Sequence, residues 1–319
     1  MIAVPDDFPS VFEGSAAHAR AQELGAVRVD TARGADAGDE LARRIGTAQI
    51  AINIRAYARF TDAVLRACPE LRMISIWGTG TDNIDLAAAA RRGVTVCNTA
   101  GVNAIAVAEH AIALMLSVAR KIPAVDREMR GSAWPRETLV QLHGKTLGVF
   151  GAGAIGAQVA RLGRAFGMTV LAWSARSDAA RLTALGLTPA SQADILRRAD
   201  FISLHLRLTP ATRGFIGRGE FAAMQSGAIL VNTGRGQLVD RDALIEALAA
   251  GRIAGAGLDV FHDEPIRSDD PLLGFPNTVL SPHHAGQTAE VRRDGLLLTV
   301  ENIANFLNGS PTNVVSLQS

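Results

Sequence analysis

Residues 147–163 have the sequence LGVFGAGAIGAQVARLG, in which Gly151, Gly153 and Gly156 form the pattern G-x-G-x-x-G. A strand-like apolar run precedes the pattern and a helix-like run follows it, which is the context that a dinucleotide-binding loop requires. The first glycine permits a tight turn, the second lets the backbone approach a pyrophosphate, and the third lets helix and strand pack closely. The helix N-terminus would then present backbone N–H groups to the phosphates. Three glycines alone could form a purely structural turn, but strand, loop, helix and next strand in this order favour dinucleotide binding.

Short apolar runs alternate with helical periodicity on both sides of this loop, which predicts βα units and parallel sheets. The runs before the loop are IAV, VRV, QIAIN and RMISIW, and the later ones are TLGVFG, TVLAWS, DFISLHL, GAILVNT, AGAGLDVF and NTVLS. We therefore expect an α/β protein with two Rossmann-like doubly wound parallel-sheet domains. Asp85 would begin and Gly93 would end a helix of the first series.

The connections between the two series predict how the domains are divided. One long helix over residues 102–130 would join the first series to the second, and a last helix over residues 290–307 has no strand left to serve. We expect that last helix to return to the first domain, which makes the substrate domain discontinuous, with residues 1–100 and 287–319. The dinucleotide-binding domain would comprise residues 101–286, and substrate would bind in the cleft between the domains.

Composition excludes several classes of protein. The chain has 319 residues, of which 48% are hydrophobic and 20% charged, and this suits two folded domains. A net charge of +1 without a clustered basic face gives nucleic-acid binding little support. Two cysteines, Cys68 and Cys97, cannot form a disulfide framework and indicate a reducing cytoplasm, and the N-terminus lacks the features of a signal peptide. The apolar stretch 104–119 contains Glu109 and His110, which favours a buried helix over a membrane span.

Polar side chains follow three of the later strands, at the ends where ligands gather in parallel α/β sheets. Arg235 follows GAILVNT, a group from Asp259 to Glu264 that includes His262 and Asp263 follows AGAGL, and PHHAG follows NTVLS. An arginine, an acid and an imidazole at one face would form an acid–base site with anion recognition. Taken alone, each of these residues could equally be an ordinary surface side chain.

Six blocks in order resemble the successive motifs of the D-isomer-specific 2-hydroxyacid dehydrogenases, a family that includes phosphoglycerate dehydrogenases and glyoxylate/hydroxypyruvate reductases. The blocks are WGTGTDNIDL, GVNAIAVAEHAIALML, GAGAIG, VNTGRGQLVD, GLDVFHDEP and SPHHAGQT. The resemblance runs from about residue 50 to residue 310. It implies hydride transfer between NAD(P) and a small D-2-hydroxy or 2-keto acid, mainly the reduction of glyoxylate, hydroxypyruvate or a similar acid.

The resemblance implies that Arg235, Glu264 and His283 are the catalytic residues. His283 would exchange a proton with the substrate oxygen, and Glu264 would keep it protonated for reduction. Arg235 would bind the substrate carboxylate and polarise the carbonyl. His284 falls where the family varies, and we expect it to pack.

Further binding residues follow from the same resemblance. The backbone N–H groups of Thr79 and Gly80 would hold the substrate carboxylate, and Arg55 would meet a second anion. Ala154 replaces a usual basic residue, so one phosphate contact is missing, and Arg207 stands where the family most often has proline. The implied cofactor-binding residues are Gly151, Gly153, Ala154, Ile155, Gly156, Ser174, Arg176, Leu206, Thr233, Gly234 and Asp259.

The cofactor could be NAD or NADP. An NAD site usually has an acidic side chain near position 174, where it holds the ribose hydroxyls, but this chain has Ser174. Arg176 follows two residues later, and a guanidinium pairs well with a phosphate. The sequence therefore leans toward NADP.

Two alternatives to this interpretation remain open. A metal site using His262, Asp263, His283 and His284 has suitable ligand types, but no helical histidine pair or cysteine partner supports it, and we expect no metal. An NAD(H)-sensing binding protein of the C-terminal-binding-protein corepressor type is the alternative function. The lack of a long disordered extension or an evident peptide-docking segment favours an enzyme over that alternative.

The remaining expectations concern packing and assembly. His205 lies in an apolar strand and should be a core histidine, while Glu109 and His110 should cap or tether their helix. The apolar stretch 104–119 exceeds what one domain readily covers, and similar family members pair through this region. We therefore expect a homodimer.

Overall fold

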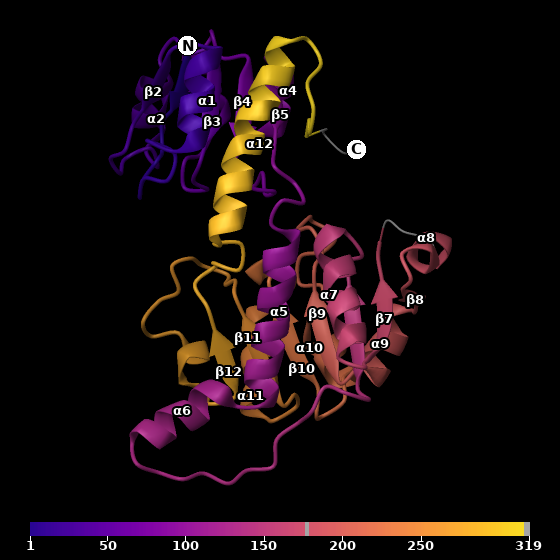
Figure 1. The fold of residues 1–319 in the computed structure, drawn as a ribbon. Helices are drawn as coiled ribbons and strands as arrows, with labels where there is room; N and C mark the ends of the chain where they lie inside the picture. Colours follow the sequence, from indigo (N-terminus) through magenta and orange to yellow (C-terminus); the bar gives the residue numbers. More distant parts are fainter. Residues whose placement is uncertain (176–178, 316–319) are drawn as a thin grey trace. The chain divides into compact units, whose positions relative to one another are not determined.

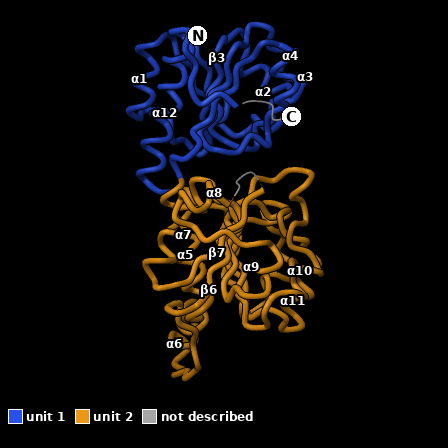
Figure 2. The backbone as a smooth tube through the Cα atoms, turned by 90° about the vertical axis from the view of Figure 1, so that its right-hand side faces the viewer, with its two compact units in different colours: residues 1–103, 288–319 blue, residues 104–287 orange. Residues whose placement is uncertain are grey.

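The computed structural model describes residues 1–175 and 179–315, and the chain divides into two compact units. The first unit consists of Met1–Asn103 together with Thr288–Ser319, and the second is Ala104–Gln287 (Figure 2). Both units contain a parallel sheet with helices, so the expected α/β class with two Rossmann-like domains is confirmed. Of the helices in the described residues, none combines the length and apolar character needed to span a membrane.

The first unit is a five-stranded parallel sheet in the order β2-β1-β3-β4-β5. Its strands are β1 (Ile2–Val4), β2 (Val27–Val29), β3 (Ile50–Asn53), β4 (Met73–Ile76) and β5 (Thr95–Cys97). Its helices are α1 (Ala16–Leu24), α2 (Gly38–Ile45), α3 (Asp62–Ala67), α4 (Leu86–Arg91) and α12 (Ala289–Leu307). The order 2-1-3-4-5 is a doubly wound arrangement, in which helices cover both faces of the sheet.

The last helix, α12, packs within the first unit against α1 and β4 (Figure 1). Its residues Leu296, Val300 and Ile303 recur at helical spacing and are buried in the same core as the first strands. Gly295 permits this close packing, because a Cβ there would lie 2.5 Å from Nε1 of Trp77. The two ends of the chain therefore build one hydrophobic core.

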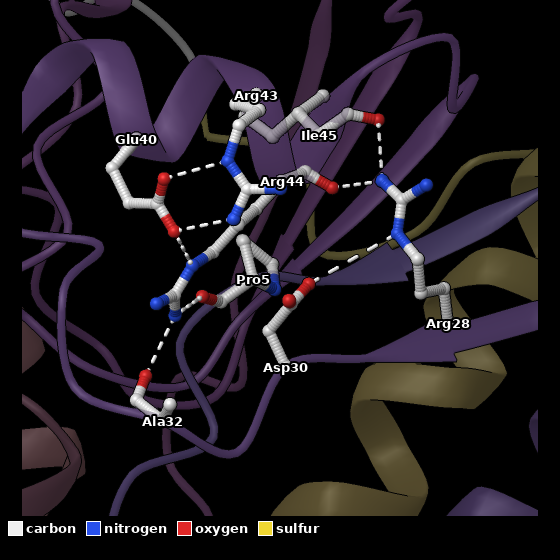
Figure 3. Close-up of polar contacts among 8 residues, drawn as sticks. All are labelled: Pro5, Arg28, Asp30, Ala32, Glu40, Arg43, Arg44 and Ile45. Carbon is white, nitrogen blue, oxygen red and sulfur yellow. Dashed lines mark hydrogen bonds and ion pairs between the residues drawn. The ribbon is translucent and has the colours of Figure 1, made fainter.

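A buried arginine organises the loops at one end of this first sheet (Figure 3). The side chain of Arg44 is only 5% exposed, and its guanidinium donates to the carbonyl oxygens of Pro5 (2.9 Å) and Ala32 (2.7 Å) and to Glu40 (2.7 Å). Hydrogen bonds from Arg43 first and Arg44 second lower the pKa of Glu40 to about 2. Because a buried charge needs such partners, Arg44 ties the segments after β1 and β2 to helix α2.

The second unit is a seven-stranded parallel sheet in the order β12-β11-β10-β9-β6-β7-β8. Its strands are β6 (Thr146–Phe150), β7 (Thr169–Trp173), β8 (Thr188–Pro189), β9 (Phe201–Leu204), β10 (Ile229–Asn232), β11 (Gly255–Leu258) and β12 (Thr278–Leu280). Its helices are α5 (Ala104–Ala119), α6 (Ile122–Arg130), α7 (Ala154–Ala165), α8 (Ala179–Ala184), α9 (Gln192–Arg198), α10 (Arg218–Ala223), α11 (Arg241–Ala249), η1 (Gly236–Leu238) and η2 (Pro271–Gly274). The strand order reverses direction at β6 and β9, the point at which α/β sheets bind ligands.

Two sequence-based expectations need correction here. The long helix over residues 102–130 is two helices, because Lys121 adopts a left-handed conformation (φ 50°) and Pro123 opens α6. The stretch 104–119 is also covered within the second unit itself, since ten of the sixteen residues of α5 are buried. Burial of these residues within one chain means that α5 alone does not indicate a homodimer, which stays a prediction.

Candidate active site

Each of the three glycines in the 151–156 loop is required for a different structural reason. Gly151 has φ 100°, and a Cβ there would lie 2.5 Å from the carbonyl oxygen of His205. A Cβ on Gly156 would lie 1.9 Å from the carbonyl oxygen of Gly151, so only glycine lets α7 approach the loop this closely. Gly153 is different, because it is exposed and a Cβ there would meet nothing within 4 Å. Open space over Gly153 is what close approach of a pyrophosphate needs.

The N-terminus of α7 is also suited to phosphates. Its N-cap is Gly153, which has no side chain to accept a hydrogen bond from the first turn. The uncapped N–H groups and the helix dipole favour an anion at this position. Ala154 and Ile155 form the first turn of α7, next to the glycine loop.

The other expected cofactor residues follow the carboxyl ends of strands in the same sheet. Ser174 follows β7, Leu206 lies two residues after β9, and Thr233 and Gly234 follow β10. The Thr233 hydroxyl oxygen is buried and has no hydrogen-bond partner among the described residues. A buried polar atom without a partner is rare and fits a group reserved for a ligand. Arg176, expected to select the cofactor, lies outside the described residues.

The structure brings two of the three expected catalytic residues into direct contact. Nδ1 of His283 lies 2.7 Å from Oε2 of Glu264, whose other oxygen accepts from the backbone N–H of Phe261 (3.0 Å). Glu264 belongs to the loop after β11 and His283 to the loop after β12, and these two strands are neighbours. The side chains remain 36% and 46% exposed, respectively, so solvent or a substrate can reach them.

Arg235 is the N-cap residue of η1 and lies three residues after the end of β10, the next strand in the sheet. Its Nη1 donates to the carbonyl oxygen of Gly234 (2.8 Å), and its charge acts on Glu264. Burial is the largest influence on Glu264 and opposes ionisation, but the hydrogen bonds from His283 and Phe261 and the charges of His283 and Arg235 outweigh it. The pKa of Glu264 is therefore lowered, so its carboxylate is the partner that Nδ1 of His283 meets.

The loop that carries His283 has an unusual backbone. His283 adopts φ 50°, which is left-handed and uncommon for a residue with a side chain. Its N–H donates to the carbonyl oxygen of Asp259 (2.7 Å), while the carboxylate of Asp259 accepts from the N–H groups of His284 (3.0 Å) and Ala285 (2.9 Å). Asp259, which the resemblance assigned to the cofactor, is thus also the residue that shapes this loop.

His110 and Ser281 join this arrangement through contacts that no sequence motif indicates. Nε2 of His110, on α5, lies 2.8 Å from Oγ of Ser281, and Ser281 contacts Asp259. Expecting His110 to tether its helix was reasonable, but its partner lies 171 residues away, so only the fold reveals it. In the sequence, only the position of Ser281 directly before Pro282, at the end of a predicted strand, could have pointed to this residue.

His284 packs edge-on against His110, with ring centroids 5.2 Å apart and an interplanar angle of 78°. His110, Asp259 and His284 offer potential metal-ligand atoms within 4.8 Å of one another. This group differs from the set considered from the sequence, in which His262 figured; Nε2 of His262 instead contacts the carbonyl oxygen of Val239 (2.8 Å). His205 directly follows β9 and is partly buried, where Nε2 lies 2.8 Å from Oγ of Ser203 and burial lowers its pKa to about 4.

The expected substrate-binding residues of the first unit lie after β3 and β4. The carbonyl oxygen of Thr79 accepts from the side chain of Asn98 (2.9 Å), which fixes the loop that includes Gly80. Arg55 stacks its guanidinium 5.8 Å from the centre of the Trp77 ring. The N–H of Arg55 donates to the buried carboxylate of Asp6 (2.8 Å).

Fold and site together define a dinucleotide-binding α/β protein with histidine, glutamate and arginine at the ends of three neighbouring strands. A family model described as D-isomer specific 2-hydroxyacid dehydrogenase, NAD binding domain, matches residues 112–285. The chain belongs to this family, as the ordered motifs indicated.

Curated relatives and a solved structure agree with this membership. The chain is 40% identical over 284 residues to D-3-phosphoglycerate dehydrogenase of Archaeoglobus fulgidus, covering 88% of this chain and 54% of that protein. It is 42% identical over 274 residues to glyoxylate reductase of Aeropyrum pernix, covering 82% of each. The chain thus spans about half the length of the first relative. A solved acyclic imino acid reductase in complex with NADPH and D-arginine superimposes with a TM-score of 0.90 at 28% identity, covering 99% of both chains.

Proposed function

We propose that this protein is an NAD(P)-dependent D-2-hydroxyacid dehydrogenase that works mainly as a reductase of small 2-keto acids, such as glyoxylate or hydroxypyruvate. The observation that carries the proposal is the 2.7 Å contact between His283 and Glu264, with Arg235 at the end of the next strand. A proton donor beside a carboxylate, together with a guanidinium, suits reduction of a carbonyl next to a carboxylate.

The division of roles follows from the contacts. When bound, the nicotinamide supplies a hydride in reduction and accepts one in oxidation. Glu264 engages Nδ1 of His283, so Nε2 is the nitrogen left to give a proton to the substrate oxygen. In the direction of oxidation, the same nitrogen takes that proton back.

Arg235 would bind the substrate carboxylate through its planar guanidinium. It lies between two glycines at the start of η1, and its own backbone is extended (φ −142°). In the first unit, the backbone N–H groups of Thr79 and Gly80 and the guanidinium of Arg55 are proposed to contribute to binding the acid.

For the cofactor, the lean toward NADP rests on Ser174, which offers a hydroxyl and no negative charge at the end of β7. The matching family model is described as NAD binding, and one structural relative holds NADPH, so relatives do not decide between the two. The test compares kcat/KM for NADH and NADPH in the parent and in Arg176→Ala. A preference for NADH that the substitution leaves unchanged would contradict the assignment of Arg176 to the ribose phosphate.

The enzymatic proposal is tested by following nicotinamide absorbance with glyoxylate, hydroxypyruvate and pyruvate, each with NADH and with NADPH. Turnover with at least one acid, yielding the D isomer of the hydroxy acid where the product is chiral, is expected. Tight cofactor binding without turnover across the panel would instead favour the dinucleotide-sensing, corepressor-like alternative.

We also propose a homodimer, now on different grounds from those expected. None of the nine residues of α6 is buried, and short helices without packing partners are marginal in water. The helix projects from the rest of the second unit (Figure 2), and the segment after it exposes 71% of Trp134. A second copy covering α6 and Trp134 would bury this apolar surface. Light scattering at micromolar concentration should give the mass of two chains, and a monomer mass would contradict the proposal.

A further inference from the structure

The loop that carries His283 has an intrinsically unfavourable backbone conformation, so contacts with other residues must stabilise it. A left-handed backbone at a residue with a side chain persists only where surrounding contacts enforce it. Here one residue supplies three such contacts: Asp259 accepts from the backbone N–H groups of His283, His284 and Ala285. Asp259 is 1% exposed and packed on all sides. A change in the orientation of its carboxylate would therefore shift the backbone of residues 283–285 and with it the ring of His283.

The orientation of Asp259 depends in turn on a chain of two side chains. Oγ of Ser281 lies 2.6 Å from Oδ1 of Asp259 and 2.8 Å from Nε2 of His110. A serine hydroxyl has one proton, and the hydrogen bond to Oδ1 of Asp259 uses it. Ser281 therefore donates to Asp259, and its oxygen accepts a hydrogen bond from Nε2–H of His110.

His110 is well placed to anchor this chain. It lies on α5, a helix with ten buried residues that packs against β10, β11, β12 and α7. Burial first, and then the charge of His284, lower the pKa of His110, although Asp259 acts in the opposite direction. A neutral His110 has one ring proton, and the contact with Ser281 requires that proton on Nε2.

We propose that His110 and Ser281 are positioning residues of the reaction: they orient the Asp259 carboxylate, which holds residues 283–285 so that Nδ1 of His283 meets Glu264. This inference rests on the proposed function. It also disfavours a cation between His110, Asp259 and His284, because such an ion would compete for Nε2 of His110 and displace the Ser281 hydroxyl. The ring of His284 has no part in the chain, whereas a cation site would need it.

The first experiment has a readout that does not depend on activity. Long-range proton–nitrogen NMR of the cofactor-free protein with ¹⁵N-labelled histidine should show His110 as the neutral tautomer protonated on Nε2, with the signal assigned by its loss in His110→Gln. Protonation on Nδ1 alone would reverse the deduced hydrogen-bond direction and overturn the inference. This result stands whether or not the enzyme turns over the acids tested.

The second experiment asks whether the chain acts as a unit. Ser281→Val and His110→Leu should each lower kcat about 10- to 100-fold, as a small misplacement of a catalytic group does, while KM for the keto acid changes far less. Ser281→Thr and His110→Gln, which keep the hydroxyl and a nitrogen donor, should recover most of the loss. His284→Ala is the matched control and should keep near-parent activity.

The double variant Ser281→Val/His110→Leu decides between positioning and independent structural damage. If the two residues act through one hydrogen-bond chain, the double variant should lose about as much kcat as Ser281→Val alone. Losses that multiply, no recovery with Thr and Gln, or a loss in His284→Ala equal to that in His110→Leu would each overturn the inference.

Discussion

The two units contain matching aspartates that do different work. Asp6 follows β1 in the first unit and Asp259 follows β11 in the second, and both are almost fully buried. Each carboxylate accepts backbone N–H groups from the loop after the neighbouring strand: Ile54 and Arg55 after β3 for Asp6, and His284 and Ala285 after β12 for Asp259. A buried aspartate at a strand end thus shapes, in both units, a loop that carries an expected functional residue.

The difference lies in what else each carboxylate meets. Asp6 accepts from the amide side chain of Asn53 (2.6 Å), and its burial raises its pKa to about 6 despite its hydrogen bonds and the nearby charge of Arg55. Asp259 accepts from the hydroxyl of Ser281, which is in turn hydrogen-bonded to His110 on α5, a helix distant in sequence. The first aspartate therefore holds the backbone of Arg55, the proposed binding arginine, through local contacts, whereas the second connects the loop that carries His283 to the core of its unit.

The largest effect should come from the residue that the second aspartate positions. Replacing His283 by alanine should lower kcat about 10²- to 10⁴-fold, since general acid–base groups contribute on that scale. His284→Ala, on the same loop, removes only a ring contact and should lower kcat far less. Steady-state kinetics of the two folded variants make the comparison, and equal losses would show that the wrong ring was assigned.

The next effect concerns stability, and it should distinguish the first aspartate. The folded-state pKa of Asp6 is raised from 3.8 to about 6, so its stabilising contribution is full below pH 3.8 and is lost as pH rises through about 6. The shift corresponds to about 3 kcal/mol. As pH rises from 3.8 to about 6, the free energy of unfolding of the parent should therefore fall by about 3 kcal/mol relative to that of Asp6→Asn, because asparagine does not titrate.

Denaturant unfolding at several pH values measures this difference. Trp77 fluorescence in a Trp134→Phe/Trp173→Phe background reports on the first unit alone, because the other two tryptophans belong to the second. A difference between parent and variant that does not change with pH would mean that Asp6 stays ionised and that its backbone contacts offset its burial.

Apolar runs in the sequence predicted β1 to β4, β6, β7 and β9 to β12, because burial on both faces of a parallel sheet leaves that pattern. They did not predict β5, whose three residues Thr95–Cys97 follow a polar helix end, or β8, which has two residues. The break at Lys121 was missed because apolar periodicity continues across it, although Pro123 marked it.

The residues of the candidate site also divide into those that sequence motifs predicted and those that only the fold reveals. Family motifs identified His283 and Glu264, and the structure brings these residues within 2.7 Å of each other. The role of Ser281 could not be predicted, because a serine before a proline is common in loops and its partner His110 is distant in sequence. Residues that act through long-range contacts leave no local pattern, and only the fold reveals them.

A third prediction separates the two aspartates by kinetics. Asp259→Asn should lower kcat about 10- to 100-fold, because an amide cannot accept from Ser281, His284 and Ala285 as a carboxylate does, and His283 is misplaced as a result. Asp6→Asn should instead raise KM for the keto acid, because it disturbs Arg55 and not the proton donor. If both variants changed the same constant, the two loops would not have separate roles.

The last prediction concerns the contact that the second aspartate secures. Glu264→Gln removes the negative charge from the contact with Nδ1 of His283, so the variant should reduce the keto acid more slowly than the parent. Reduction should fall about tenfold at neutral pH, and the difference between variant and parent should narrow under acidic conditions, where Glu264 of the parent is protonated as well. In the parent, the pKa of Glu264 is lowered, so the pair persists as pH falls until Glu264 itself is protonated below its usual range. The measurement is kcat against pH for reduction, with a solvent isotope effect to confirm that proton transfer limits the rate. A profile identical to that of the parent would place Glu264 outside the reaction and leave the 2.7 Å contact a purely structural one.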